Sequence, residues 1–168
     1  MNTVKLFLMN KIFSLLPETR CFGFKVVLLR WCGATIGRNV RITSSVRIML
    51  TGDLYVGDDV WIGEQTLIAG GDATIKIGSH VDIGPRVSII TGTHKLWEDS
   101  ERAAGASYSK PIIIEDGVWL GCAAIILGGV AIGRGTAIAA GAVLIHDASS
   151  HALYAGNPAI KKRTRCPF

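Results

Sequence analysis

His94 lies in the stretch TGTH, at the point where a regular pattern of aliphatic residues stops. An unperturbed imidazole exchanges its proton near neutral pH, so a histidine at such a break is a candidate general base. The other histidines, His80, His146 and His151, occupy a predicted turn or the end of the chain. We expect these three side chains to be exposed and chemically idle.

The composition predicts one aliphatic domain. The 168 residues are 49% hydrophobic and only 7% aromatic, with 20 glycines. The N-terminal stretch MNTVKLFLMNKIFSLLP is too short to span a membrane, and Asn10 and Lys11 interrupt it as a signal peptide. The cysteines show no CxxC spacing, which favours free thiols and a cytoplasmic protein; they are Cys21, Cys32, Cys122 and Cys166.

Charge is distributed unevenly along the chain. Residues 1–47 hold eight Lys or Arg against one Glu, a net charge of +7. Residues 48–160 hold six basic against twelve acidic residues, a net of −6, and the four basic residues of 161–168 add +4. A nucleic-acid-binding protein more often presents one continuous basic face, so basic ends favour an anionic membrane or the phosphates of a small ligand.

A six-residue repeat determines the expected fold. Aliphatic residues recur every six positions in four blocks, and a small residue often follows each of them. The positions are Ile36, Ile42, Ile48; Val56, Ile62, Ile68; Ile77, Ile83, Ile89; and Ile114, Leu120, Ile126, Ile132, Ile138, Leu144. Because this period fits neither a helix nor a hairpin sheet, we predict triangular coils of about eighteen residues. Five coils fit: 36 to about 53, 56–73, 77–91, 112–131 and 132–149.

The repeat is interrupted between residues 92 and 111. Each coil of a stacked solenoid is held by two neighbours, so an insertion of this length is expected to be functional. The segment THKLWEDSERAAGASYSK mixes aromatic, charged and small residues. We expect it to project as a loop that contacts a polar acceptor or a neighbouring subunit.

The C-terminal half resembles the hexapeptide-repeat acyltransferases. The stretch PIIIEDGVWLGCAAIILGGVAIGRGTAIAAGAVLIHDASSHALYAGNPAIKKR is similar to the signature of the galactoside, maltose and nodulation-factor O-acetyltransferases. The stretch LPETRCFGFKVVLLRWCGATIG is similar to leaders of surface-polysaccharide acetyltransferases. The resemblance implies an all-β fold, a left-handed parallel β-helix, assembled as a homotrimer with an acetyl-CoA groove between subunits and no metal.

The resemblance also implies roles for particular residues. His94 matches the family's catalytic base, which takes the proton of an attacking hydroxyl. The backbone N–H of Cys122 matches the donor to the oxyanion. Residues expected to contact the cofactor are Gly121, Cys122, Ala139 and Ala140 along the pantetheine arm, and Lys161, Lys162 and Arg163 at the phosphates. Cys122 is not expected to act as a nucleophile, because the role belongs to its backbone.

Acceptor recognition is less well defined by the resemblance. Trp119 matches a position beside the active groove, and Trp97 lies in the inserted segment. Galactoside-type relatives carry Asn near position 64, where this chain has Glu64, and the family's PGV is GGV here (Gly128 to Val130). The first departure leaves the identity of the acceptor open.

Three segments are expected: a helical leader or cap over 1–33, the β-helix over 34–150 with its loop at 92–111, and a basic tail over 151–168. Val4, Leu8, Ile12 and Leu15 recur at helical spacing. The leader either caps the first coil, which would otherwise expose unpaired backbone groups, or lies on anionic lipid at the inner face of the membrane.

The sequence therefore predicts an acetyl-CoA-dependent O-acetyltransferase that acts on a hydroxyl of a sugar or surface glycan. An alternative is N-acetylation of an amino sugar or of a nucleotide-linked amino sugar. Two further classes are a non-catalytic scaffold and a zinc enzyme of the same fold, like the γ-type carbonic anhydrase. The zinc enzyme is disfavoured because it needs closely spaced histidine ligands, and no other histidine lies within five residues of His94.

Overall fold

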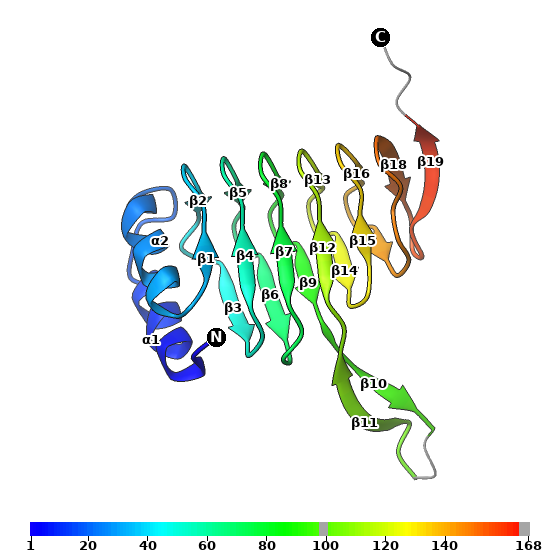
Figure 1. The fold of residues 1–168 in the computed structure, drawn as a ribbon, viewed down its shortest axis with the longest axis horizontal. Coiled ribbons are helices and arrows are strands. Elements are labelled where there is room, and N and C mark those ends of the chain that lie inside the picture. The colour runs from blue at the N-terminus through cyan, green and yellow to red at the C-terminus, as the bar shows by residue number, and fades with distance from the viewer. Residues whose placement is uncertain (98–100, 165–168) are drawn as a thin grey trace.

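The computed structural model describes residues 1–97 and 101–164, and Cys166 of the predicted tail lies outside this range. Two helices, α1 (Thr3–Phe13) and α2 (Phe22–Trp31), precede a solenoid of short parallel strands. The strands stack into five coils that form a three-sided prism (Figure 1). The predicted left-handed β-helix is confirmed.

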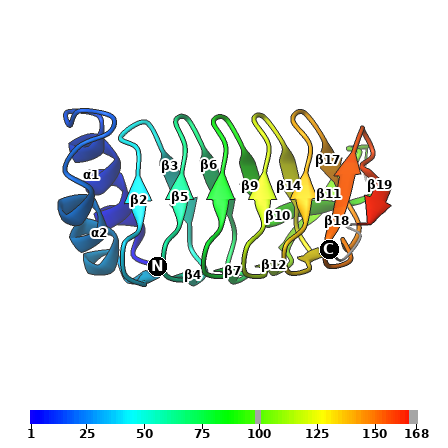
Figure 2. The same ribbon diagram turned by 90° about the horizontal axis from the view of Figure 1, so that it is seen from above.

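Each side of the prism is one sheet, with one strand from every coil. Face 1 contains β1 (Thr35–Ile36), β4 (Leu54–Val56), β7 (Ile75–Ile77), β12 (Ile112–Ile114) and β15 (Ala131–Ile132). Face 2 contains β2 (Arg41–Ile42), β5 (Trp61–Ile62), β8 (Asp82–Ile83), β13 (Trp119–Leu120), β16 (Ala137–Ile138), β18 (Ala152–Ala155) and β19 (Ile160–Thr164). Face 3 contains β3 (Arg47–Leu50), β6 (Leu67–Gly70), β9 (Ser88–Ile90), β14 (Ile125–Leu127) and β17 (Val143–Leu144). Figure 2 looks onto face 2.

The hexad residues form the core, as the repeat predicts. On face 2, one inward column consists of Ile42, Ile62, Ile83, Leu120 and Ile138, all buried and paired in register between coils. The small residue after each aliphatic sits where backbones pass closely. A Cβ atom at Gly121 would lie 2.5 Å from the backbone nitrogen of Ala140. Glycine is therefore required at this corner.

The leader closes the N-terminal end of the prism (Figures 1 and 2). Helix α1 contacts β3, and α2 contacts β1 and β2. The side facing the prism consists of apolar residues, namely Leu6, Met9, Phe13, Val26 and Leu29, all buried. The Glu18 carboxylate accepts hydrogen bonds from the backbone N–H groups of Ser44 and Ser45, at 3.0 and 3.1 Å. The helices thus cover an end that would otherwise expose apolar surface and unpaired backbone groups.

The inserted segment is more regular than the predicted loop. Strands β10 (Gly92–Leu96) and β11 (Ala104–Ser109) form an antiparallel hairpin, with an irregularity between His94 and Leu96. The hairpin leaves the edge between faces 3 and 1 and projects away from the prism (Figure 1). Glu98 and Asp99, which belong to the predicted polar mixture, lie outside the described residues.

The C-terminal segment is also ordered into strands over its described part. Strand β18 adds to β16 in parallel, and β19 folds back on β18 antiparallel. The basic residues of β19 are therefore fixed at the C-terminal end of face 2. Among the described residues, no helix has the length and apolar character needed to cross a membrane.

Candidate active site

A hydrogen bond across the hairpin fixes the ring of His94. Its Nδ1 lies 2.9 Å from the carbonyl oxygen of Gly105 on the opposite strand of the hairpin. A carbonyl oxygen only accepts, so in the neutral ring Nδ1 carries the hydrogen and Nε2 keeps its lone pair. The side chain is exposed, which leaves Nε2 accessible to a substrate hydroxyl.

The base of the hairpin is tied to the neighbouring coil by two residues that the sequence did not single out. Ser109 Oγ donates to the Asp72 carboxylate at 2.5 Å and accepts from the backbone N–H of Ala73 at 3.1 Å. The hydrogen bond from Ser109 is the main cause that lowers the pKa of Asp72 below its ordinary value. The two residues are 37 positions apart, and neither belongs to the hexad pattern, so no sequence signal connects them.

Cys122 presents its backbone N–H at the edge between faces 2 and 3. The flanking peptide groups are fixed, because Gly121 N–H donates to Ile138 O at 2.7 Å and Cys122 O accepts from Gly141 N–H at 2.9 Å. Among the described residues, nothing accepts the Cys122 N–H itself. A fixed, unpaired donor beside small residues can stabilise a developing oxyanion. The Sγ atom accepts a long contact of 3.7 Å from Arg86.

The predicted cofactor residues are brought together in part. Gly121 and Cys122 stack one coil below Ala139 and Ala140, along the same edge. Trp119 lies on face 2 beside this edge and is 55% exposed, so it is available to a ligand. Glu64 occupies the same edge two coils away, roughly 10 Å at the spacing of stacked strands.

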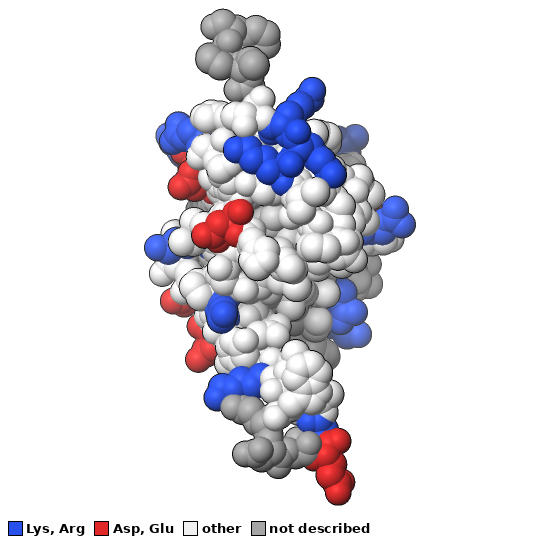
Figure 3. Space-filling view, turned by 90° about the vertical axis from the view of Figure 1, so that its right-hand side faces the viewer, with Lys and Arg blue, Asp and Glu red and all other residues white. Residues whose placement is uncertain are grey.

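The basic residues lie farther along the same side of the prism. Lys161, Lys162 and Arg163 are exposed on β19, which is separated from β16 by β18. Figure 3 looks onto this end of the molecule and shows basic side chains gathered near the top. The small-residue edge therefore leads from Cys122 toward a cationic end.

His94 and Cys122 do not meet within one chain. Cys122 lies at the edge between faces 2 and 3, and the hairpin leaves from the edge between faces 3 and 1. Six residues of coil 4 separate Cys122 from Gly128 at the other edge, which corresponds to ~15–20 Å at about 3.3 Å per residue. Trp97, also on the projecting hairpin, is 76% exposed and stands apart from Trp119 and Glu64.

The surface between these two edges is mostly apolar, and Arg47 and Ser88 are the polar residues that point outward from its strands. The side chains that point outward from face 3 include Met49, Leu67, Ala69, Ile90, Ile125, Leu127 and Val143, all exposed or half-buried. The outward residues of face 2 include Arg41 and Asp82, and those of face 1 include Lys76. Face 3 is therefore the side of the prism best suited to contact another copy.

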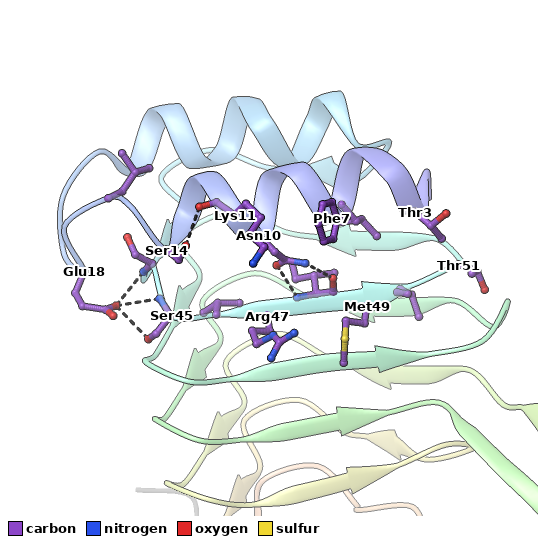
Figure 4. Close-up of a pocket in the computed structure, with 16 residues that line it drawn as sticks. Thr3, Phe7, Asn10, Lys11, Ser14, Glu18, Ser45, Arg47, Met49 and Thr51 are labelled. Atoms are coloured by element: carbon purple, nitrogen blue, oxygen red, sulfur yellow. Dashed lines mark hydrogen bonds between the residues drawn. The ribbon is translucent and has the colours of Figure 1, made fainter.

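A separate hollow lies away from these residues. A groove of about 780 Å³ runs between α1 and β3 (Figure 4). Asn10 spans it, because its amide exchanges two hydrogen bonds with the backbone of Ile48, at 2.9 and 3.2 Å. No histidine or cysteine lines the groove, and it continues the apolar surface of face 3. Among residues 1–97 and 101–164, no three His, Cys, Asp or Glu side chains converge in a way that could hold a metal ion.

Comparison with known proteins defines the class of protein. The family model described as bacterial transferase hexapeptide (six repeats) matches residues 111–146. Over 155 residues, the chain is 32% identical to the putative colanic acid biosynthesis acetyltransferase WcaF of Escherichia coli, covering 92% of this chain and 81% of WcaF. The chain belongs to the hexapeptide-repeat acyltransferase family.

A second relative matches a shorter region. The galactoside O-acetyltransferase of Lactococcus lactis is 41% identical over 92 residues, which are 55% of this chain and 44% of that protein. This chain spans only about half the length of that protein and of two similar putative acetyltransferases from yeasts.

Solved structures agree on the fold. A variant of AntD, an N-acyltransferase from Bacillus cereus in complex with dTDP-4-amino-4,6-dideoxyglucose and coenzyme A, superposes with a TM-score of 0.72 at 20% identity, covering 90% of this chain and 93% of AntD. A hexapeptide-repeat acetyltransferase from Vibrio cholerae, complexed with acetyl-CoA, gives a TM-score of 0.65 at 24% identity, covering 96% and 86%. At these identities the likeness establishes the β-helix alone.

Proposed function

We propose that this protein is an acetyl-CoA-dependent O-acetyltransferase that acts on a hydroxyl of a sugar or surface glycan. The observation that carries the proposal is the hydrogen bond from His94 Nδ1 to Gly105 O, since it leaves Nε2 free as a base at the start of a projecting hairpin. Likeness to WcaF over nearly the whole chain supports a polysaccharide acceptor.

The proposed reaction needs two groups of the protein. His94 Nε2 removes the proton of the acceptor hydroxyl as its oxygen attacks the thioester carbonyl carbon. The Cys122 N–H donates a hydrogen bond to the carbonyl oxygen while that oxygen carries negative charge. When the carbon–sulfur bond breaks, His94 returns the proton to the departing thiolate, so that the products are an acetyl ester and a free thiol.

The proposed binding residues follow the edge described above. The co-substrate would lie along Gly121, Cys122, Ala139 and Ala140, where small side chains leave room for a thin pantetheine arm. Lys161, Lys162 and Arg163 would meet its phosphates. Trp119, Glu64 and Trp97 would contact the acceptor, and the carboxylate of Glu64 suits a sugar hydroxyl.

The proposed assembly is a homotrimer with the active site between subunits. His94 of one copy and Cys122 of the next would face each other across a groove, which requires the apolar face 3 to be covered by a neighbour. A closed ring of three copies supplies three equivalent grooves. The protein would work in the cytoplasm, where acetyl-CoA is available.

The test is consumption of acetyl-CoA against free sugars, nucleotide sugars and lipid-linked glycans. We expect thiol release with a hydroxyl acceptor and an acetyl product that mild alkali removes, since esters are cleaved and amides survive. An alkali-stable product would instead establish N-acetylation of an amino sugar, the alternative that AntD's ligand suggests. Absence of transfer to any acceptor, with a normally folded protein, would contradict the proposal.

A further inference from the structure

The outer side of the two-helix cap is apolar. Each helix turns one side to the prism, and the opposite side of each faces solvent. The large hydrophobic residues on that outer side are Val4 (68% exposed), Leu8 (46%), Phe24 (50%), Val27 (58%) and Trp31 (45%), and Leu15 (85%) is exposed in the turn that follows α1. We call these six residues the cap face.

The residues of the cap face belong to neighbouring segments of the chain. Helices α1 and α2 contact each other and lie side by side across the end of the prism (Figures 1 and 2). Isolated exposed hydrophobic residues are ordinary, but five large ones on adjacent helices and a sixth in the turn after α1 mark an interaction surface. The cap face points along the prism axis, away from face 3, so copies packed side by side through face 3 would leave it uncovered.

The charges around the cap face are almost entirely positive. Residues 1–33 contain five Lys or Arg and a single acid, Glu18. That acid is exposed, but its carboxylate is engaged by the first coil, where it accepts hydrogen bonds from Ser44 and Ser45. Lys25 is buried and donates to the carbonyls of Pro17, Glu18 and Ile42, so it does not belong to the outer surface.

Arg30 donates to the backbone carbonyls of Ile36 and Gly37, which leaves three cations to frame the cap face. Lys11 and Arg20 are exposed, and Lys5 is half-buried with its Nζ 4.9 Å from the centre of the Trp31 ring. Lysines that extend past aromatic rings, with the charge at the rim and the stem on apolar surface, are typical of membrane-interface segments. An apolar patch framed by cations complements a surface that is anionic outside and apolar beneath.

We propose that the cap face docks on an anionic lipid bilayer. The two helices would lie in the plane of the interface, with the cap face among the acyl chains and Lys5, Lys11 and Arg20 at the lipid phosphates. If the protein is the trimer proposed above, three caps point the same way, and their simultaneous contact multiplies a weak individual affinity.

This docking would set the height of the active site. The hairpin leaves the third coil, two coil spacings beyond the first, and the cap adds the thickness of one helix layer. The distance from the membrane to the hairpin is then roughly 20 Å. A glycan carried on a lipid can extend that far, which deepens the proposed function by favouring lipid-linked acceptors over free sugars.

The test is co-sedimentation of the full-length protein with vesicles. We expect binding to phosphatidylcholine mixed with phosphatidylglycerol, little binding to phosphatidylcholine alone, and weaker binding at high salt. The double variant Leu8→Glu, Val27→Glu should lower the partition coefficient for anionic vesicles at least about tenfold, because both charges would enter the interface. A matched control is Ile113→Glu, which changes a 42% exposed aliphatic residue on face 1 and should bind like the wild type.

A second pair keeps the apolar residues and changes only charge. Lys11→Glu combined with Arg20→Glu should also reduce binding to anionic vesicles, and circular dichroism should show that all variants keep their fold. The proposal is overturned if the wild-type protein stays in the supernatant, or if it binds neutral vesicles equally well. It is also overturned if the Glu variants bind vesicles like the wild type. The same holds if their only effect is to dissociate the assembly, because the cap face would then be a contact between copies. Because the assay contains no acetyl-CoA, its result is independent of the proposed reaction.

Discussion

At the scale of single residues, the proposed chemistry depends on a histidine ring fixed by one hydrogen bond. The bond from His94 Nδ1 to Gly105 O selects the tautomer, and the exposed position leaves the other nitrogen free. The prediction of a reactive histidine came from the break in the hexad pattern and from the family resemblance. Sequence could not show the partner of Nδ1, since that contact depends on the pairing of two strands within the inserted segment.

Replacement of His94 tests its role directly. His94→Ala should lower kcat by roughly 10²–10⁴-fold, the usual contribution of a general base. The KM for acetyl-CoA and the melting temperature should change little, because the side chain is exposed and its proposed role is proton transfer rather than binding. His80→Ala is the matched control, since His80 lies at a corner near Asp59. A His94→Ala enzyme with more than about a tenth of wild-type kcat would contradict the assignment.

Ser109 is predicted to position the hairpin without touching substrate. Ser109→Ala removes the donor to Asp72 and the acceptor for Ala73 N–H, so the hairpin base should lose its fixed direction. We expect kcat to fall about tenfold, since small misplacements of a catalytic group are costly, with KM for acetyl-CoA unchanged. Asp72→Ala should have a similar effect, and the double variant should be no worse than either one. Additive losses would show that the two residues act separately.

The same contact predicts a shift in titration. The pKa of the Asp72 carboxyl is lowered from 3.8, mainly by the Ser109 hydroxyl. Because the pKa is lower in the folded state, the ionised carboxylate stabilises the fold at any pH above its ordinary, unfolded pKa. This stabilisation is lost as the pH falls through the lower pKa of the folded state. NMR titration should therefore place the Asp72 carboxyl below 3.8 in the wild type and higher in Ser109→Ala. An unchanged titration in the variant would contradict the contact.

At the scale of elements, the hexad pattern predicts both the β-helix and which residues lie on the same edge of it. Because the aliphatic residues repeat in register, the residues after them fall on shared edges. The resemblance implied that Gly121, Cys122, Ala139 and Ala140 contact the cofactor, and the register places them on one edge. The inserted hairpin was expected as a loop, since its strands follow no hexad and pair only with each other. Asp72 and Ser109 were missed because contacts between a coil and an insertion have no period.

The corner glycines give a test at this scale. Gly121→Ala places a Cβ 2.5 Å from Ala140 N, so we expect a loss of about 1–3 kcal/mol in the free energy of unfolding and a displaced Cys122 peptide. Gly23→Ala is the control, since nothing lies within 4 Å of its added Cβ and it occupies α2. That substitution should stabilise by about 0.5–1 kcal/mol. Thermal unfolding distinguishes the two, and equal effects would argue against close packing of backbone at the Cys122 corner.

At the scale of the whole molecule, the proposed chemistry requires assembly, because His94 and Cys122 lie on different edges of one chain. Leu127→Arg places a charge on the outer surface of face 3, where Leu127 is 36% exposed. We expect folded monomers by analytical ultracentrifugation, with transfer activity lost, because an unpaired charge at an apolar contact opposes association. Ile113→Arg on face 1 is the control and should remain trimeric and active. A monomer that retained full activity would exclude a site between subunits.

The most direct measurement mixes two inactive variants in one assembly. His94→Ala lacks the base, and Ala140→Phe fills the predicted cofactor edge at an exposed position. If each site takes His94 from one copy and the Cys122 edge from the next, a mixed trimer regains one of its three sites, about a third of the wild-type rate. If both groups act within one chain, no mixture of these variants recovers activity, and the account of the active site is wrong.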